Sequence, residues 1–178
     1  YIDQSITKKD RYGKEFQAYG GDFDDRPTDY NFCGNGIVYG KDRAPSPKMS
    51  EVKFNYQNIS AVVKPNRVTV INKNLFVSTS AYDCVVTLQK DGIPVQTAQM
   101  QTDVPPLSKQ EYALPFEQQK EPGEYAITVS FLLKKDTIWA KKGHEVAFGQ
   151  DVYTVERTVQ PRKAPIEVIE GTVNLGVR

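Results

Sequence analysis

The sequence predicts a mainly β protein: an antiparallel, immunoglobulin-like β-sandwich preceded by an irregular region and one short helix. Three observations support this fold class. Apolar and polar residues alternate in several segments of residues 58–160, turn-forming residues separate these segments, and a helical repeat of apolar residues comes directly before them. The chain has 178 residues, of which 39% are hydrophobic, so it can bury a core.

The irregular region contains an unusual stretch, YGGDFDDRPTDYNFCGNG, at residues 19–36. It holds four Asp, four Gly, two Asn and four aromatic residues. Carboxylates and amides pair with sugar hydroxyls, aromatic rings pack on sugar faces, and glycines let the backbone approach a ligand. The composition therefore fits a polyol or sugar site. The alternative is an ordered surface loop whose Asp residues cap turns and pair with Arg26.

Other chemistries fit this stretch poorly. Asp22 and Asp24 match a calcium loop, but Arg26 takes the third ligand position. A phosphate-binding loop needs Gly-Lys-Ser/Thr after its glycines, and none follows. A nucleophilic triad needs a histidine, and the single one, His144, lies far along the chain inside a strand pattern. We expect His144 to be a structural histidine with satisfied hydrogen bonds.

Residues 47–57 are predicted to form a short amphipathic helix. Ser46 is a good N-cap, and Pro47 suits the first helical position. Met49, Val52 and Tyr56 recur at spacings of three and four, which places them on one stripe of the helix.

Seven strands are predicted after the helix. In residues 82–89 and 125–133 every second residue is apolar, and Asp91-Gly92 after the first of these segments is a strong hairpin signal. Such strands at short spacing favour a two-sheet sandwich. Residues 160–165 read as a linker, and 166–178 as the first strand of a further domain. The remaining predicted strands are 59–64, 67–72, 95–101, 110–114 and 145–157.

Charge and cysteine content exclude some functions. Lys and Arg number 23 against 22 Asp and Glu, so no strong field of one sign exists to bind nucleic acid. No apolar run is long enough to span a membrane. Cys33 and Cys84 are expected to be free thiols. Free thiols, together with the lack of a signal peptide at the start of the chain, favour the cytoplasm as the compartment. The chain lacks an initial Met and reads as a piece of a longer protein.

Six blocks of residues stand in a characteristic order along the chain: DQ at residues 3–4, YGGDF at 19–23, DYNFCGNG at 29–36, DRAPSP at 42–47, EVK at 51–53 and WAKKGHEVAF at 139–148. Their order resembles the long β-galactosidases of glycoside hydrolase family 2. By this resemblance, residues 1–57 are the C-terminal end of a catalytic (β/α)8 barrel, with residues 5–46 as a loop, residues 58–160 are a β-sandwich domain, and residues 161–178 lead into a further domain.

The resemblance implies a retaining β-galactosidase whose two catalytic Glu residues lie before Tyr1. It implies that Asn35 and Phe32 bind the galactosyl group and sodium, Asn35 through its amide and Phe32 through its backbone carbonyl. Asp29 would support their loop. Some relatives carry Asn at a peripheral magnesium position where this chain has Thr28, and a Thr hydroxyl is a poorer magnesium ligand.

Sodium and magnesium are therefore expected cofactors of the whole enzyme, and neither is expected to bind this chain firmly. The expected partners are a β-galactoside, the remaining domains and further copies of the same protein in a homo-oligomer, with no nucleic acid or membrane. The alternative function is a non-catalytic carbohydrate-binding or structural sandwich module. An aromatic platform would favour carbohydrate binding, but Trp139, the single Trp, precedes a stretch that looks structural, so a spacer role is preferred.

Overall fold

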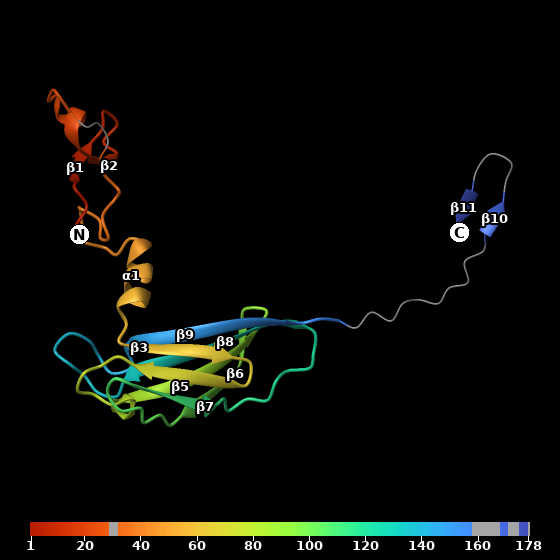
Figure 1. Cartoon of the computed structure of the whole chain (residues 1–178). Helices are drawn as coiled ribbons and strands as arrows, with labels where there is room; N and C mark the ends of the chain where they lie inside the picture. The colour runs from red at the N-terminus through yellow and green to blue at the C-terminus, as the bar shows by residue number, and fades with distance from the viewer. Residues whose placement is uncertain (29–31, 158–167, 171–174, 178) are drawn as a thin grey trace.

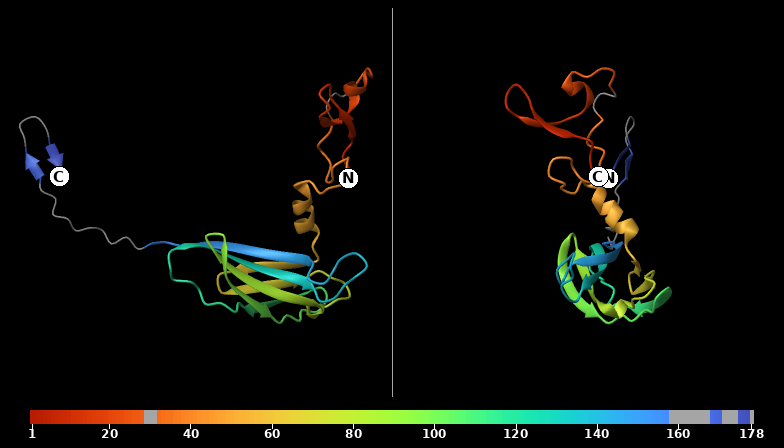
Figure 2. Two further views of the ribbon diagram at one scale, coloured as in Figure 1. Left: turned by 180° about the vertical axis from the view of Figure 1, so that it is seen from behind. Right: turned by 90° about the vertical axis from the view of Figure 1, so that its left-hand side faces the viewer.

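A two-sheet β-sandwich forms the larger part of the fold, and a smaller N-terminal region is joined to it by one helix (Figure 1). The computed structural model describes residues 1–28, 32–157, 168–170 and 175–177. Figure 2 shows from two further sides that the helix, α1 (Lys48–Tyr56), stands between the N-terminal region and one end of the sandwich. The predicted fold class is confirmed.

The sandwich consists of a three-stranded and a four-stranded antiparallel sheet, and each of its seven strands coincides with a predicted one to within two residues at each end. Register shifts interrupt the ladders at Leu88/Gln89 and at Phe131/Leu132. The first sheet has the order β3 (Ile59–Lys64), β4 (Arg67–Asn72), β7 (Ser108–Ala113). The second has the order β6 (Ile93–Met100), β5 (Tyr82–Lys90), β8 (Gly123–Leu133), β9 (Glu145–Val155).

The core lies between the two sheets. Because side chains alternate across a strand, every second residue of β5 and β8 points inward. Val86 of β5 pairs with Val129 of β8, and both are fully buried. The predicted apolar faces of these strands are thus confirmed. Val68 and Val70 of β4 are buried in the same hydrophobic cluster.

The hairpin predicted at Asp91-Gly92 is also confirmed. Both residues have positive φ, 49° and 81°, which is the backbone of a type I′ turn. Glycine adopts this conformation at little cost, and aspartate tolerates it better than most residues. The turn therefore joins β5 to β6, because the backbone twist of a type I′ turn matches the twist of the two strands.

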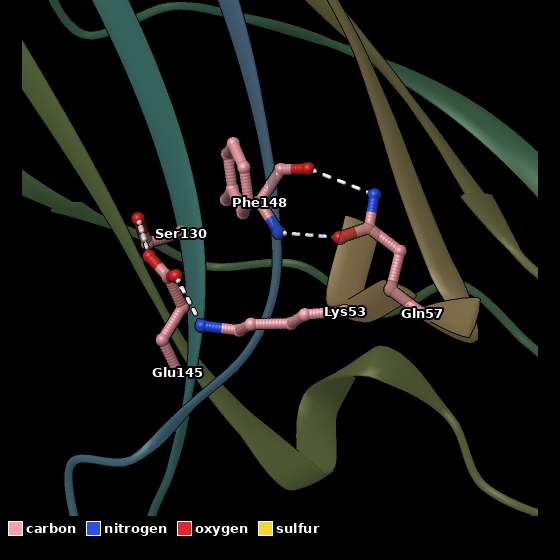
Figure 3. A network of polar contacts seen from close by, with 5 residues as sticks. All are labelled: Lys53, Gln57, Ser130, Glu145 and Phe148. Atoms are coloured by element: carbon pink, nitrogen blue, oxygen red, sulfur yellow. Dashed lines mark hydrogen bonds and ion pairs between the residues drawn. The ribbon is translucent and has the colours of Figure 1, made fainter. Parts of the chain in front are cut away.

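A network of polar contacts fixes α1 to strand β9 (Figure 3). The buried Gln57 side chain, just after α1, donates to the Phe148 carbonyl at 3.0 Å and accepts from the Phe148 N–H at 2.9 Å. Lys53 pairs with Glu145 at 2.9 Å, and Ser130 donates to the other oxygen of Glu145 at 2.8 Å. These contacts set the position of the helix on the sandwich.

The helix itself begins differently from its prediction. Pro47, not Ser46, is the N-cap residue, and no side chain caps the helix. The Ser46 hydroxyl instead donates to the Gly36 carbonyl at 3.1 Å in a buried position. A tertiary contact has thus replaced the local cap. The apolar stripe is only half covered, since Met49 and Val52 are partly buried while Tyr56 is 82% exposed.

The N-terminal region contains a hairpin within residues 5–46, a stretch that the sequence predicted as one irregular loop. Strand β1 (Ile6–Lys9) pairs antiparallel with β2 (Glu15–Ala18). The Asp10 carboxylate closes the turn by accepting from the N–H groups of Tyr12 and Lys14, at 2.8 and 2.9 Å. A 3-10 helix, η1 (Gly20–Phe23), follows. A second one, η2 (Thr79–Ala81), precedes β5.

After β9, the described residues form two short antiparallel strands, β10 (Val168–Glu170) and β11 (Leu175–Val177). The sequence predicted a single strand over 166–178. Gly171 and Asn174, both turn-forming types, lie between the two strands in the sequence. The predicted linker at 160–165 lies outside the described residues.

Two further expectations concern the thiols and the membrane. Cys33 and Cys84 are both free, as predicted. Burial raises the pKa of the Cys84 thiol to about 12. In the described part of the chain, no helix is long and apolar enough to cross a membrane.

Candidate functional site

The candidate site is built around Asn35, which lies in a turn that neighbouring segments hold from several sides. The Asp3 carboxylate accepts from the Gly34 N–H at 2.7 Å. Lys48, the first residue of α1, donates to the Gly34 carbonyl at 3.0 Å. Together with the Ser46 contact to Gly36, these bonds fix the backbone on both sides of Asn35.

The start of the chain lies directly beside this turn. Ile2 forms a parallel bridge with Val38, and the Asp3 N–H donates to the Val38 carbonyl at 2.9 Å. A Cβ on Gly36 would lie 2.4 Å from the Asp3 nitrogen, so glycine is required for this approach. The site therefore forms only because residues about 30 positions apart in the sequence pack backbone against backbone.

Asn35 presents an unsatisfied acceptor. Its Oδ1 atom is buried and has no hydrogen-bond partner among the described residues. A buried polar atom without a partner costs about 1–3 kcal/mol, so such atoms in native proteins call for an explanation. A ligand hydroxyl or a cation at this atom would remove the cost.

Phe32, the second predicted site residue, stands at the surface close to this turn. Its side chain is 49% exposed, and its ring centroid lies 6.0 Å from that of Tyr19, tilted by 49°. An exposed ring held on one side by another ring can form the wall of a binding site. Asp29, predicted to support the loop, lies outside the described residues.

A shallow hollow of about 450 Å³ adjoins the site at Asp3. The ring of Phe23, one of its walls, also has the Lys8 ammonium group 4.9 Å from its centroid. The hollow is thus bordered by one buried carboxylate and by aromatic side chains, among them Tyr19. Its lining residues are Asp3, Gln4, Ser5, Ile6, Ala18, Tyr19, Gly20 and Phe23.

One aspartate of the opening stretch, Asp22, accepts a hydrogen bond from the backbone. Asp22 accepts from the Tyr19 N–H at 3.0 Å, and Asp24 has φ of 62°, a left-handed conformation that glycine adopts more easily. The Thr28 hydroxyl oxygen accepts from the Gly21 N–H at 2.9 Å. Thr28 is the residue that stands where some relatives were expected to carry an Asn at a peripheral magnesium position.

The donor set for a metal is small. Among the described residues, no three His, Cys, Asp or Glu side chains gather into a metal-binding cluster. The orphaned amide oxygen of Asn35 does fit a hard cation such as sodium, which prefers oxygen ligands. The residues present thus fit part of a sodium site.

Both glutamates of residues 1–57 contact a neighbouring side chain. Glu15 forms an ion pair with Lys41. The hydrogen bond to Glu15 and the negative charge of Glu15 raise the pKa of Lys41. Glu51 accepts from the amide of Asn55 at 2.7 Å, one turn along the same helix.

Comparison with known proteins gives the family. Residues 1–61 match the model "Glycosyl hydrolases family 2, TIM barrel domain", and residues 68–153 match "Beta-galactosidase, domain 4". The chain belongs to glycoside hydrolase family 2. Within that family, it combines sequence from the end of the barrel with the sandwich that follows.

Curated relatives in glycoside hydrolase family 2 match along almost the whole chain. A β-galactosidase of Halalkalibacterium halodurans is 51% identical over 99% of the chain, which is 18% of that relative. β-Galactosidases of Clostridium acetobutylicum and Streptococcus thermophilus are each 41% identical, over 99% and 100% of the chain and 20% and 17% of their own length. The chain thus spans about one fifth of the length of these relatives.

A second concave surface lies between α1 and the sandwich. It is a pocket of about 300 Å³ that includes Tyr56, Tyr82, Trp139 and His144. Trp139 is 63% exposed, and the His144 ring meets it edge-on at 5.4 Å. Trp139 is therefore an exposed aromatic side chain beside a pocket, which the sequence did not indicate.

His144 differs from its prediction. It is exposed and lies just before β9, not inside the strand, and its imidazole has no hydrogen bond in the described part of the chain. Its contact with Trp139 is a ring contact only.

The sequence assigned no role in the site around Asn35 to three residues that contact its turn: Asp3, Ser46 and Lys48. Of these, Asp3 had a signal, because an acidic residue followed directly by Gln was already part of the family resemblance.

Proposed function

We propose that this chain is part of a retaining β-galactosidase and supplies one side of its galactosyl-binding pocket. The observation that carries the proposal is the buried, unpartnered Oδ1 of Asn35 on an anchored turn beside the exposed ring of Phe32. An amide oxygen accepts from a sugar hydroxyl, and an aromatic ring packs on the apolar face of the sugar. The names of the curated relatives support galactose as the sugar.

Sodium fits this proposal as a partner of Asn35. We propose that the Asn35 amide oxygen and the Phe32 backbone carbonyl are the ligands from this chain, and that the bound ion helps hold a substrate hydroxyl. Two neutral oxygens make a weak site, so the isolated chain should bind sodium weakly or not at all. A melting temperature that rises with sodium, but not with potassium at equal ionic strength, would contradict this. Magnesium at the peripheral position is not part of the proposal.

The catalytic carboxyl groups belong to the rest of the proposed enzyme. In retaining hydrolysis, one carboxylic acid protonates the leaving oxygen while a carboxylate attacks the anomeric carbon, and water then opens the covalent intermediate. This chain's residues bind and orient the sugar for that attack. The purified chain should therefore hydrolyse no galactoside, and turnover above that of an empty-vector preparation would refute this assignment.

The experiment uses a full-length polypeptide that contains this chain. It is assayed on nitrophenyl β-galactoside, β-glucuronide and β-mannoside, with and without sodium, beside an Asn35→Ala variant. We expect a preference for the galactoside that requires Asn35 and responds to sodium. Asn55→Ala, on the exposed surface of α1, is the matched control and should behave as wild type. Activity on another glycoside, or indifference to Asn35→Ala, would overturn the proposal.

A carbohydrate-binding role for the sandwich is a second candidate, favoured by the pocket at Trp139. The exposed indole ring and nearby amide groups have the character of a sugar-binding surface. Galactose titration of the chain by NMR tests it. Shifts centred on Trp139 and Tyr56, saturating at millimolar galactose or below, would support this candidate. Shifts centred on Asn35, or no saturation, would leave the sandwich as a spacer.

The proposed enzyme has further expected partners. A β-galactoside is its substrate, the other domains of the same polypeptide surround this chain, and we propose a homo-oligomer in the cytoplasm. Free Cys33 and Cys84 are compatible with a reducing compartment. Sedimentation of the full-length protein tests the oligomer.

A further inference from the structure

Asp3 is the most deeply buried acidic side chain of the described residues, and the candidate site above does not explain why it is there. It is 5% exposed, and one carboxylate oxygen, Oδ2, accepts from the Gly34 N–H at 2.7 Å. The other oxygen, Oδ1, is buried without a partner among the described residues. Burying a carboxylate is costly, so a residue of this kind is retained where its contacts serve a purpose.

The contact of Asp3 acts on one peptide group. Gly34 directly precedes Asn35, and its φ is +76°. A Cβ placed on Gly34 would have no atom within 4 Å. Packing therefore does not hold Gly34 in place. Its N–H is held by the charged Asp3 and its carbonyl by the charged Lys48, and bonds to ionised groups are shorter and stronger than neutral ones.

The two charged residues come from different elements. Asp3 lies on the extended segment that pairs with Val38, and Lys48 begins α1. Lys48 also reaches the Gly36 carbonyl, at 3.5 Å. The turn at Asn35 is thus held between the N-terminal strand segment and the helix.

We propose that Asp3, assisted by Lys48, is a positioning residue for Asn35. Asp3 fixes the Gly34 peptide, and this in turn fixes the direction in which the Asn35 amide is presented to the ligand. Because the unpartnered oxygens of Asp3 and Asn35 are both buried acceptors, the surroundings of Asn35 attract a donor or a cation. The inference rests on the proposed function, since it concerns the same sugar-binding turn.

The experiment compares four variants of the full-length protein. Asp3→Ala removes the acceptor for Gly34, while Asp3→Asn keeps an acceptor oxygen of the same shape. Lys48→Met removes the donor on the other side. Asp10→Ala is the matched control, because Asp10 also accepts from two backbone N–H groups but does so in the β1–β2 hairpin turn.

Two readouts separate positioning from general stability. The first is the split between KM and kcat for nitrophenyl β-galactoside. The loss of one charge-assisted hydrogen bond is expected to raise KM about tenfold in Asp3→Ala, with kcat within about threefold of wild type. Asp3→Asn should recover most of the KM, Lys48→Met should raise it about threefold, and Asp10→Ala should leave it unchanged. The second readout is hydrogen–deuterium exchange of the peptide covering residues 32–38, which should speed up in Asp3→Ala, speed up to a smaller extent in Lys48→Met, and stay unchanged in Asp10→Ala.

The outcomes distinguish this inference from the proposed function. If Asn35→Ala raises KM while Asp3→Ala and Lys48→Met leave both KM and the exchange unchanged, the positioning role is wrong and the sugar site stands. If Asn35→Ala has no effect, the sugar site fails, and the exchange measurement still decides whether Asp3 holds the turn. If Asp3→Ala fails to fold, the exposed Lys48→Met carries the test, and a wild-type KM with unchanged exchange in Lys48→Met counts against the positioning role.

Discussion

Replacement of Gly149 by Ala tests how the two sheets of the sandwich meet. Gly149 lies on β9 in one sheet, directly against Ala61 of β3 in the other. A Cβ on Gly149 would lie 2.0 Å from the Ala61 carbonyl oxygen and 2.8 Å from its Cβ. Because nonbonded heavy atoms are best about 3.5 Å apart, β9 would have to move away from β3 by roughly 1.5 Å.

The expected cost follows from what surrounds the new methyl group. Overpacking a core usually costs about 1–3 kcal/mol, and here the neighbouring atoms are backbone atoms and a methyl that cannot rotate away. We therefore expect the free energy of unfolding to fall by about 3 kcal/mol, a large share of the roughly 5–15 kcal/mol of an ordinary domain. With a slope of about 1.5 kcal/mol per molar urea, the unfolding midpoint would fall by about 2 M.

Urea unfolding followed by far-ultraviolet circular dichroism measures this change. Fluorescence is a poorer probe, because Trp139 is largely exposed in the folded state. Gly92→Ala is the control: φ is +81° there with nothing within 4 Å, so it costs only the left-handed backbone, about 1 kcal/mol. If Gly149→Ala shifts the midpoint no further than Gly92→Ala, the contact with Ala61 does not constrain the sandwich, and the reasoning is wrong.

Two further changes test single side chains. Gln57→Ala removes both hydrogen bonds to Phe148 and should destabilise the chain by about 2 kcal/mol, measured by the same urea titration. Gln150→Ala, which loses one exposed bond on the same strand, should cost under about 0.5 kcal/mol, and equal costs would refute the role of Gln57. Burial raises the Cys84 pKa from 9.0 to about 12, so the folded state keeps the thiol protonated where the unfolded state loses the proton. Stability should therefore be unaffected below pH 9 and fall by about 1.4 kcal/mol per pH unit between 9 and 12, and Cys84→Ala should remove this part of the pH dependence.

The sandwich could be predicted because its signals are local. The alternation of apolar residues and the turn residues between segments are visible without knowledge of the fold, so the bounds of β3 and β4 agree with the prediction. The start of β6 was placed two residues late. Ile93 and Pro94 show no alternation and become strand only because the turn at Asp91-Gly92 folds them onto β5.

The N-terminal region was harder to predict because its structure depends on contacts between distant residues. Strands β1 and β2 have four residues each, and half of these residues are exposed, so the strands carry little alternation. Their one local signal is the turn from Asp10 to Gly13. Ser46 has the residue type of an N-cap, but the Gly36 carbonyl competes for its hydroxyl, and that competitor is invisible in the local sequence.

The candidate site shows the same limit. Asn35 and Phe32 were named from a family resemblance, and nothing in the residues 19–36 themselves showed which amide would be left without a partner. Asp3 is 31 residues from Gly34, and no periodicity or turn rule connects two such positions. The residue types thus indicated what kind of ligand fits the site. The tertiary contacts decide which polar atom is left without a partner and is available to that ligand.

The helix α1 connects this site to the sandwich through an unbroken series of contacts. Lys48 at its first residue holds the Gly34 carbonyl, and Gln57 just after its last residue holds β9. A helix of nine residues spans about 13 Å, so α1 can act as a short rigid connection between the turn at Asn35 and strand β9. If it does, Gln57→Ala in the full-length protein should speed up hydrogen exchange of residues 32–38, as Asp3→Ala does, without touching that turn. Unchanged exchange there, despite the lower stability of the sandwich, would mean that the sandwich is only a spacer.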